Sequence, residues 1–317
     1  MKAIVLAITL IGWSIVYGQE ADTTAPDPNW KLSATYGVNG TQSAFVNWSA
    51  GGRNNISFLG YIEGSANYLK DKIKWDNDLG LALGGLLYVG VGSSSAGGVQ
   101  KTDDRIDIAT NFGFEMKEHW YVSFVGGFRT QFMDGFNFPN DSTRVSKWMA
   151  PGYVNLALGV DFSPSENFSV YLSPVAGKLT FVQDQGLANS GAFGVDPAEF
   201  DPSGALLELG NQFRGEFGAY FKLKYTATLA KNIEMKSKIE LFSNYIVKPE
   251  NIDVNAEVIF NFKVNNWFSA SLNWNLIYDH DIMITDNQGN IGPRTQFKSV
   301  LGIGIAYTMR NFIVKKD

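Results

Sequence analysis

Histidine and cysteine, which are well suited to acid–base, metal and nucleophilic chemistry near neutral pH, are scarce in this chain. Its 317 residues include two histidines, His119 and His280, and no cysteine. Asp279 and Asp281 flank His280, and two carboxylates beside an imidazole could hold a metal ion or position a general base. The surrounding pattern predicts a strand, however, and alternation along a strand sends both carboxylates to the face opposite the imidazole. The sequence therefore predicts neither a metal site nor a catalytic base here.

A serine hydrolase is the other chemical alternative, because a histidine can activate a neighbouring serine as a nucleophile. Ser243 and Ser299 are predicted to face outward, and of the two only Ser299 could lie beside His280 at a similar height. His119 falls in a short turn at the other end of the strands, across a membrane thickness of about 25 Å. We predict no enzyme and no catalytic, metal-binding or cofactor-binding residue, with a hydrolase near His280 as the least favoured alternative.

The elements that would position these residues are strands with a two-residue period. In residues 253–279, apolar side chains occupy every second position on both sides of an Asn-Asn break, which is typical of strands with one apolar face. The same alternation runs through the chain, and no helix is predicted between the strands. The twelve predicted strands span residues 30–48, 56–69, 73–88, 105–116, 120–132, 153–162, 168–182, 213–229, 233–245, 253–265, 267–279 and 294–309.

The connections between these strands alternate in length. One set consists of short turns, and the other includes the long spans 89–104, 133–152, 183–212 and 280–293. Membrane barrels have short turns on one side of the bilayer and long loops on the other. We predict an all-β fold, a transmembrane up-and-down antiparallel β-barrel of about twelve strands, with its short turns in the periplasm and its long loops outside the cell.

The distribution of charge indicates which strand face meets lipid. Apart from the seventh strand, which is interrupted near Pro174 and Gly177, the more apolar face carries no Asp, Glu, Lys or Arg, although 18% of the chain is charged. A charge facing lipid at mid-bilayer costs about 2–4 kcal/mol, so the apolar face is predicted to point outward. The charges predicted to face the lumen, and to line any channel, are Glu63, Asp76, Asp78, Asp107, Arg129, Arg214, Glu216, Lys222, Lys224, Lys236, Lys238, Glu240, Glu257 and Lys298. The residues predicted to form aromatic girdles at the membrane surfaces are Trp30, Trp75, Trp120, Tyr278 and Tyr307.

Four of the predicted lumen charges are lysines on two strands joined by a tight turn, namely Lys222, Lys224, Lys236 and Lys238. We predict that Leu229 pairs with Ile233 across this turn. That register sets Lys222 opposite Glu240, and it sets Lys224 opposite Lys238. Like charges across from one another stay ionised only where water or carboxylates reach them, so we expect a hydrated lumen that prefers anionic solutes.

The N-terminus indicates export. Residues 1–18 have a lysine, an apolar run shorter than a membrane span and a small residue at the end, which predicts a cleaved signal peptide. Residues 19–29 are predicted to be a flexible leader, residues 30–312 the barrel and residues 313–317 a C-terminal tail. Together these features predict an integral protein of the outer membrane.

Several long motifs, in order along the chain, resemble one family. They are FVNWSAGGRNNIS (45–57), KTDDRIDI (101–108), RTQFMDGFNFP (129–139), LSPVAGKLTFV (172–182), SGAFGV (190–195), RGEFGAYFK (214–222), ELFSNY (240–245) and NIDVNAEV (251–258). On these residues the chain resembles the domain-of-unknown-function 3078 family of Bacteroidota outer-membrane β-barrel proteins. The resemblance implies the fold and the compartment, and the family has no assigned activity.

Three functions follow from these observations. We predict a non-catalytic barrel that acts as a narrow channel for small polar or anionic solutes. One alternative is a structural or partner-binding subunit of an envelope complex with a closed, salt-bridged lumen, and the other is the rim hydrolase. The predicted partners are outer-membrane lipids and either small solutes or an envelope complex; the mild net charge of −5 argues against nucleic acid. Whether loops 133–152 and 183–212 plug the lumen decides between channel and scaffold.

Overall fold

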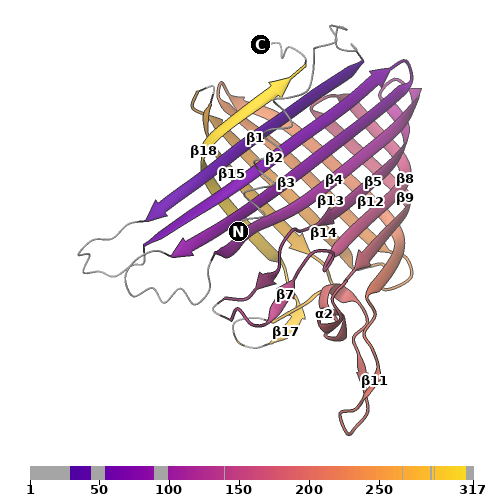
Figure 1. The fold of residues 1–317 in the computed structure, drawn as a ribbon. Helices are drawn as coiled ribbons and strands as arrows, with labels where there is room; N and C mark the ends of the chain where they lie inside the picture. Colours follow the sequence, from indigo (N-terminus) through magenta and orange to yellow (C-terminus); the bar gives the residue numbers. More distant parts are fainter. Residues whose placement is uncertain are drawn as a thin grey trace, which may run out of the picture.

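Twelve antiparallel strands form a closed barrel in the computed structural model, which describes residues 29–43, 54–88, 99–138, 140–265, 267–285, 288 and 290–311 (Figure 1). In chain order the barrel strands are β1 (Trp30–Ser43), β2 (Asn55–Lys70), β3 (Ile73–Tyr88), β4 (Gln100–Lys117), β5 (Trp120–Thr130), β8 (Gly152–Ser165), β9 (Phe168–Phe181), β12 (Phe213–Ala230), β13 (Ile233–Asn244), β14 (Ile252–Lys263), β15 (Phe268–Tyr278) and β18 (Gln296–Arg310). Each pairs with its neighbour along the chain, and β1 pairs with β18 to close the ring. The predicted fold is confirmed, and all twelve predicted strands are present. The predicted signal peptide, most of the leader and the C-terminal tail lie outside the described residues.

The long connections carry small elements of their own at one end of the barrel. In Figure 1 the short turns lie at the upper end, and the hairpin that ends in β11 projects from the lower end. These elements are β6 (Gly135–Phe136), β7 (Arg144–Ser146), α2 (Gln185–Asn189), η1 (Ala192–Gly194), β10 (Glu199–Phe200), β11 (Leu206–Glu208), β16 (Met283–Thr285) and β17 (Ile291–Pro293). The prediction that no helix lies between the strands was wrong at α2 and η1, because helices of five and three residues are too short to show a helical period.

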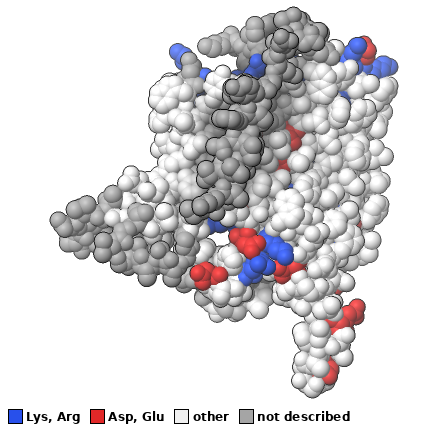
Figure 2. Space-filling view, viewed as in Figure 1, with Lys and Arg blue, Asp and Glu red and all other residues white. Residues whose placement is uncertain are grey.

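The outer face of the barrel is apolar. Phe112, Leu158 and Ile303 are 46%, 54% and 47% exposed although each lies in the middle of a strand. On the strand surface visible in Figure 2, Lys, Arg, Asp and Glu gather toward the two ends and leave the wall between them almost free of charge. The only hydrophobic environment that such a wall can face in a closed barrel is lipid, so the apolar face points outward as predicted. No helix among the described residues is long and apolar enough to cross a membrane.

Aromatic side chains pack side by side at the short-turn end of this outer face. The Trp30 ring lies 5.1 Å from that of Tyr68 and 5.8 Å from that of Trp75, measured between centroids. Trp120 lies 4.7 Å from Phe162 in the same way. Of the other predicted girdle residues, Tyr307 is exposed near the end of β18, and Tyr278 ends β15 at the long-loop side. Large amphipathic rings at these positions fit the two membrane surfaces.

Candidate functional site

The inward face of the barrel surrounds a polar cavity of about 1060 Å³. It extends from Asn29 and Asn167 at the short-turn end to Lys178 and Asp279 at the long-loop end. The predicted lumen charges that line it are Glu63, Asp76, Asp78, Asp107, Arg129, Lys222, Lys224, Lys236, Lys238, Glu240 and Glu257. Of the remaining three, Arg214 and Glu216 are not part of its lining, and Lys298 lines a separate hollow where it binds Asp103 at 3.1 Å.

The register predicted for the lysine-bearing strands is confirmed. Lys222 pairs with Glu240, and Lys224 pairs with Lys238. The detail at the turn was wrong, because a bulge between Thr228 and Ala230 sets Ala230 opposite Ile233 and leaves Leu229 out of the ladder. The bulge shifts the register by one residue between the Ala230–Ile233 pair and the Thr228–Glu234 pair. Beyond it the register is the one that a Leu229–Ile233 pair would have given, so the lysines keep their predicted partners.

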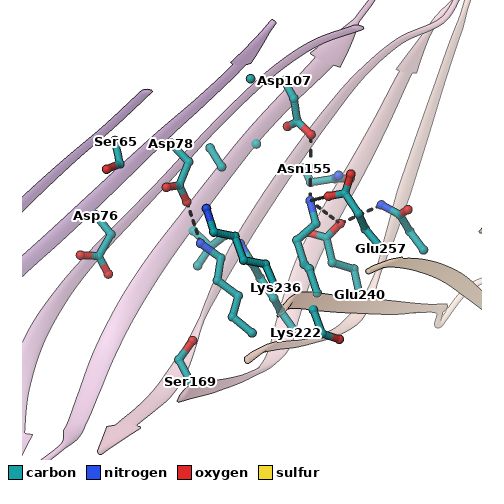
Figure 3. A pocket seen from close by; sticks show the side chains of 18 of the residues that line it. Ser65, Asp76, Asp78, Asp107, Asn155, Ser169, Lys222, Lys236, Glu240 and Glu257 are labelled. Atoms are coloured by element: carbon teal, nitrogen blue, oxygen red, sulfur yellow. Dashed lines mark hydrogen bonds and ion pairs between the residues drawn. The ribbon is translucent and has the colours of Figure 1, made fainter. Parts of the chain in front are cut away.

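The lysine-bearing wall faces a wall of carboxylates. Lys224 Nζ lies 2.7 Å from Asp78 Oδ2, and Lys238 Nζ lies 4.0 Å from Asp107 Oδ2. In the ring of strands, β3 is five places from β12, and β4 is five places from β13, so both contacts cross the lumen. Figure 3 shows Lys222 and Lys236 extending into the space that separates them from Asp76 and Asp78. The lumen therefore has opposite charge on opposite walls, and the electric field between these walls runs across the pore.

Further ion pairs form a belt across the lumen. Arg105 Nη1 lies 2.8 Å from Glu257 Oε1, and these residues come from β4 and β14, which are six places apart and thus directly opposite. Arg129 lies 3.1 Å from Asp107 and 3.9 Å from Glu240. Side chains that meet across the ring leave a narrow passage, because they occupy the middle of the lumen.

Three of the charges that line the cavity have no partner in this network, namely Lys222, Glu63 and, at the short-turn end, Arg310. Among the described residues, no hydrogen bond or ion pair engages the Lys222 ammonium or the Glu63 carboxylate, although both side chains line the cavity. Lys222 is 8% exposed. A buried ammonium without a carboxylate is costly unless water or a ligand compensates its charge, so Lys222 indicates that the cavity is hydrated or occupied.

A second layer of ion pairs lies at the long-loop end, and it includes Lys178 and Asp253, which are not among the predicted lumen charges. The Lys178 ammonium lies 2.6 Å from Asp253, 2.7 Å from Asp279 and 3.7 Å from Glu216. This layer joins β9, β12, β14 and the end of β15. Lys178 lies on the seventh predicted strand, whose alternation is interrupted near Pro174 and Gly177. The inward face of that strand was therefore not predicted, and Lys178 was missed.

The connection between β9 and β12 folds against this layer. Arg214 donates to the Gly194 carbonyl oxygen at 2.6 Å and to Glu216 at 3.0 Å, and it also binds Asp281. Four residues of this connection, Val182, Leu187, Ala188 and Val195, form a small buried apolar cluster with Ala150 of the connection before β8. The loop spanning 183–212 is thus tied to the barrel mouth, and Arg214 is the side chain that ties it.

Asp184 fixes the start of α2 in this loop. Its Oδ1 accepts from the Leu187 amide at 3.0 Å, and its Oδ2 lies 2.8 Å from Arg144 and 3.2 Å from Lys147. The Leu187 hydrogen bond first, and the two cations after it, lower the pKa of the Asp184 carboxyl to about 2. The stabilisation of the loop by this carboxylate is therefore complete above its ordinary pKa of about 3.9 and is lost as the pH falls toward 2.

We expect Asp184→Ala to loosen this loop. Losing a helix cap costs about 1 kcal/mol, so the Leu187 amide should exchange its hydrogen about fivefold faster at neutral pH. Asp184→Asn keeps an oxygen for the cap and should show a smaller effect that no longer depends on pH between 4 and 2. Asp134→Asn is the matched control, because it removes a carboxylate 2.9 Å from Arg144 and leaves the cap intact. Equal exchange rates in all four proteins would contradict this role of Asp184.

Of the residues considered for catalysis, Asp279 and Asp281 belong to the ion pairs at the long-loop end, whereas the two histidines and two serines take no part in them. His119 is in the turn between β4 and β5, and His280 follows β15 at the other end, with its Nδ1 3.2 Å from the Tyr278 hydroxyl. Ser243 donates to the Pro249 carbonyl oxygen at 2.7 Å, and Ser299 pairs with Trp274. In the part of the chain that the structure describes, no group of three or more His, Cys, Asp or Glu could hold a metal ion. The absence of enzymatic activity stays a prediction.

The fold and its interior define a transmembrane up-and-down β-barrel with a charged, largely bridged lumen. Residues 41–136 match the profile of a family described as a protein of unknown function (DUF3078), which confirms the predicted resemblance over that part of the chain. Residues 187–287 match a second profile, described as a protein of unknown function, DUF481. No curated protein matches the chain.

Solved structures with some likeness include an outer membrane channel, a porin and an autotransporter domain. The COG4313 outer membrane channel from Pseudomonas putida F1 is 14% identical, with 92% of this chain and 100% of that chain covered and a TM-score of 0.38. The NanC porin is 7% identical, with 87% and 98% covered and a TM-score of 0.36. The translocator domain of the autotransporter NalP from Neisseria meningitidis is 10% identical, with 96% and 97% covered and a TM-score of 0.33. At these scores the likeness has no bearing on what passes through or binds to this barrel.

Proposed function

We propose that this protein is a non-catalytic outer-membrane channel of narrow bore for small polar solutes, anions included. The observation that carries the proposal is the cavity of about 1060 Å³, which runs along most of the lumen and is lined by charged side chains of both signs. An unpartnered, largely buried Lys222 requires water or solute in that cavity. A planar-bilayer recording of the purified protein tests the proposal, and steady single-channel conductance is the expected result.

A structural subunit with a closed lumen is the second candidate. The contact that favours it is the Arg105–Glu257 pair, which spans the barrel from one side to the other. Ion pairs that span the lumen would stiffen the barrel and block the passage of solute. If wild-type protein gave no conductance, and neither did the variants designed below to open its long-loop end, the scaffold would replace the channel.

We expect the short turns to face the periplasm and the long loops to face outward. The native chain has no cysteine, so single cysteines report on either side. On intact cells, a membrane-impermeant thiol reagent should label a Leu207→Cys variant, since Leu207 is 66% exposed on β11. It should label Lys231→Cys, in the turn between β12 and β13, only after the outer membrane is permeabilised. The opposite labelling pattern would mean that the barrel is inverted.

A further inference from the structure

Two unpartnered charges of the lumen, Lys222 and Glu63, lie on opposite walls. They come from β12 and β2, which are six places apart in the ring of twelve strands and so face one another. Both side chains line the same cavity. Every other lysine of the β12–β13 wall has a carboxylate within 4.0 Å.

The height of the two charges follows from the neighbouring bridge. Asp78 on β3 reaches Lys224 on β12 at 2.7 Å, so these positions are level across the lumen. Glu63 pairs with Gly80, which is two residues beyond Asp78 on the same inward face. Lys222 is two residues from Lys224 in the same direction along the barrel axis, toward the long loops. Lys222 and Glu63 therefore sit at a similar height, one inward-facing step above the Asp78–Lys224 bridge.

At this level, neither charge has an ion pair or a side-chain hydrogen bond within the described residues. Glu240, the cross-strand partner of Lys222, receives hydrogen bonds from the Tyr220 hydroxyl at 2.7 Å and from the Asn255 amide at 2.8 Å. Arg105 passes near Gly80, but its guanidinium is bound to Glu257. A cation and an anion thus remain on opposite walls with the cavity between them.

We infer that the lumen holds a binding site for a zwitterionic solute, such as an amino acid or short peptide with free termini. The carboxylate of the solute binds Lys222, and its ammonium binds Glu63. A simple anion would compensate Lys222 and leave Glu63 unpaired, whereas a solute with both charges compensates both and lies along the field between the walls. The cavity is of the size that holds small organic ligands, about 300–1,000 Å³. This binding site rests on the proposed channel function, because the solute reaches it through the channel.

Calorimetric titration of the detergent-solubilised full-length protein with three peptides tests the site. The probes are triglycine, N-acetyl-triglycine, which lacks the ammonium, and triglycine amide, which lacks the carboxylate. Triglycine should bind about tenfold more tightly than either capped peptide, since a charged hydrogen bond is worth at least a factor of ten. Equal affinity for the three peptides, or no binding at all, overturns the inference.

Two substitutions assign the ends of the solute. Lys222→Gln should weaken triglycine about tenfold and leave triglycine amide unchanged, and Glu63→Gln should weaken triglycine and leave N-acetyl-triglycine unchanged. The matched controls are Lys298→Gln and Glu115→Gln, which change inward positions outside this cavity and should have no effect. A substitution that weakened all three peptides equally would indicate a general change of the lumen and would also overturn the assignment.

The outcome for the site is separate from the outcome for the channel. Binding is measured without a membrane, so a protein that bound triglycine and gave no conductance would keep the site and lose the proposed channel. A protein that conducted ions and showed no preference for triglycine would keep the channel and lose the site.

Discussion

Replacing Lys222, Lys224, Lys236 and Lys238 together by glutamine is expected to make the channel strongly cation-selective. The cavity lining of the native protein contains ten Lys or Arg and nine Asp or Glu, and the variant would retain six of the former. The carboxylates that these lysines now face would be left without their cations on the opposite wall. In a narrow, low-dielectric passage such a surplus of negative charge draws in cations and excludes anions.

The reversal potential under a tenfold salt gradient measures this change. It should move toward the cation limit, which is about 59 mV for a monovalent ion. The matched control replaces four exposed lysines at the short turns, which are Lys70, Lys72, Lys117 and Lys231. This control changes the net charge by the same amount and should leave selectivity almost unaltered, because those charges are screened by solvent. A lumen variant with native selectivity would rule out conduction past these lysines.

The single variant Lys222→Gln tests the same prediction if the quadruple variant fails to fold. It breaks no ion pair or hydrogen bond within the described residues, so the barrel should assemble normally. Its reversal potential should shift in the same direction by a smaller amount. Removing Lys224 instead leaves the half-buried Asp78 carboxylate without its ion-pair partner, and that cost explains why the quadruple variant needs a check that it is folded.

The barrel itself was predictable because membrane strands obey a strict physical alternation. Lipid excludes charge from one face and a polar lumen tolerates it on the other, so residues such as Phe260 and Asn261 report their directions from the sequence alone. Ladder registers between chain neighbours followed from the tight turns, and Lys222 opposite Glu240 is an example. Both properties are local, and a period and a turn are enough to derive them.

The contacts across the lumen could not be derived in this way. Asp78 and Lys224 are 146 residues apart in sequence, and their meeting depends on the tilt and stagger of the whole ring. Lys178 was missed for a local reason as well. Register shifts on both sides of β9 show an irregularity near Pro174, and the Ser173 hydroxyl bonds Leu158 O and Val175 O there. Such a bulge reverses the apparent alternation, so the inward side of the strand is not readable from periodicity.

The long-loop end of the lumen should open when its two cations are removed. Arg214 ties the Gly194 carbonyl oxygen to the barrel wall, and the Lys178 ammonium holds Asp253 and Asp279 together from different strands. An Arg214→Gln/Lys178→Gln variant loses both ties and leaves like charges close together, which repel one another where water is scarce. The layer should then separate, and we expect the single-channel conductance to rise severalfold.

Arg144→Gln is the control that shows whether a rise in conductance comes from the loss of this ion-pair layer or from looser loops. Arg144 binds Asp134 and Asp184 within the loops and has no contact with the Lys178 layer. It should loosen the loops and leave conductance near the native value, because the ion pairs below them still span the lumen. If Arg144→Gln raised conductance as much as the double variant, the loops and not the ion-pair layer would be the barrier. If neither variant changed it, the restriction would lie at the Arg105–Glu257 bridge, an ion pair that joins directly opposite strands.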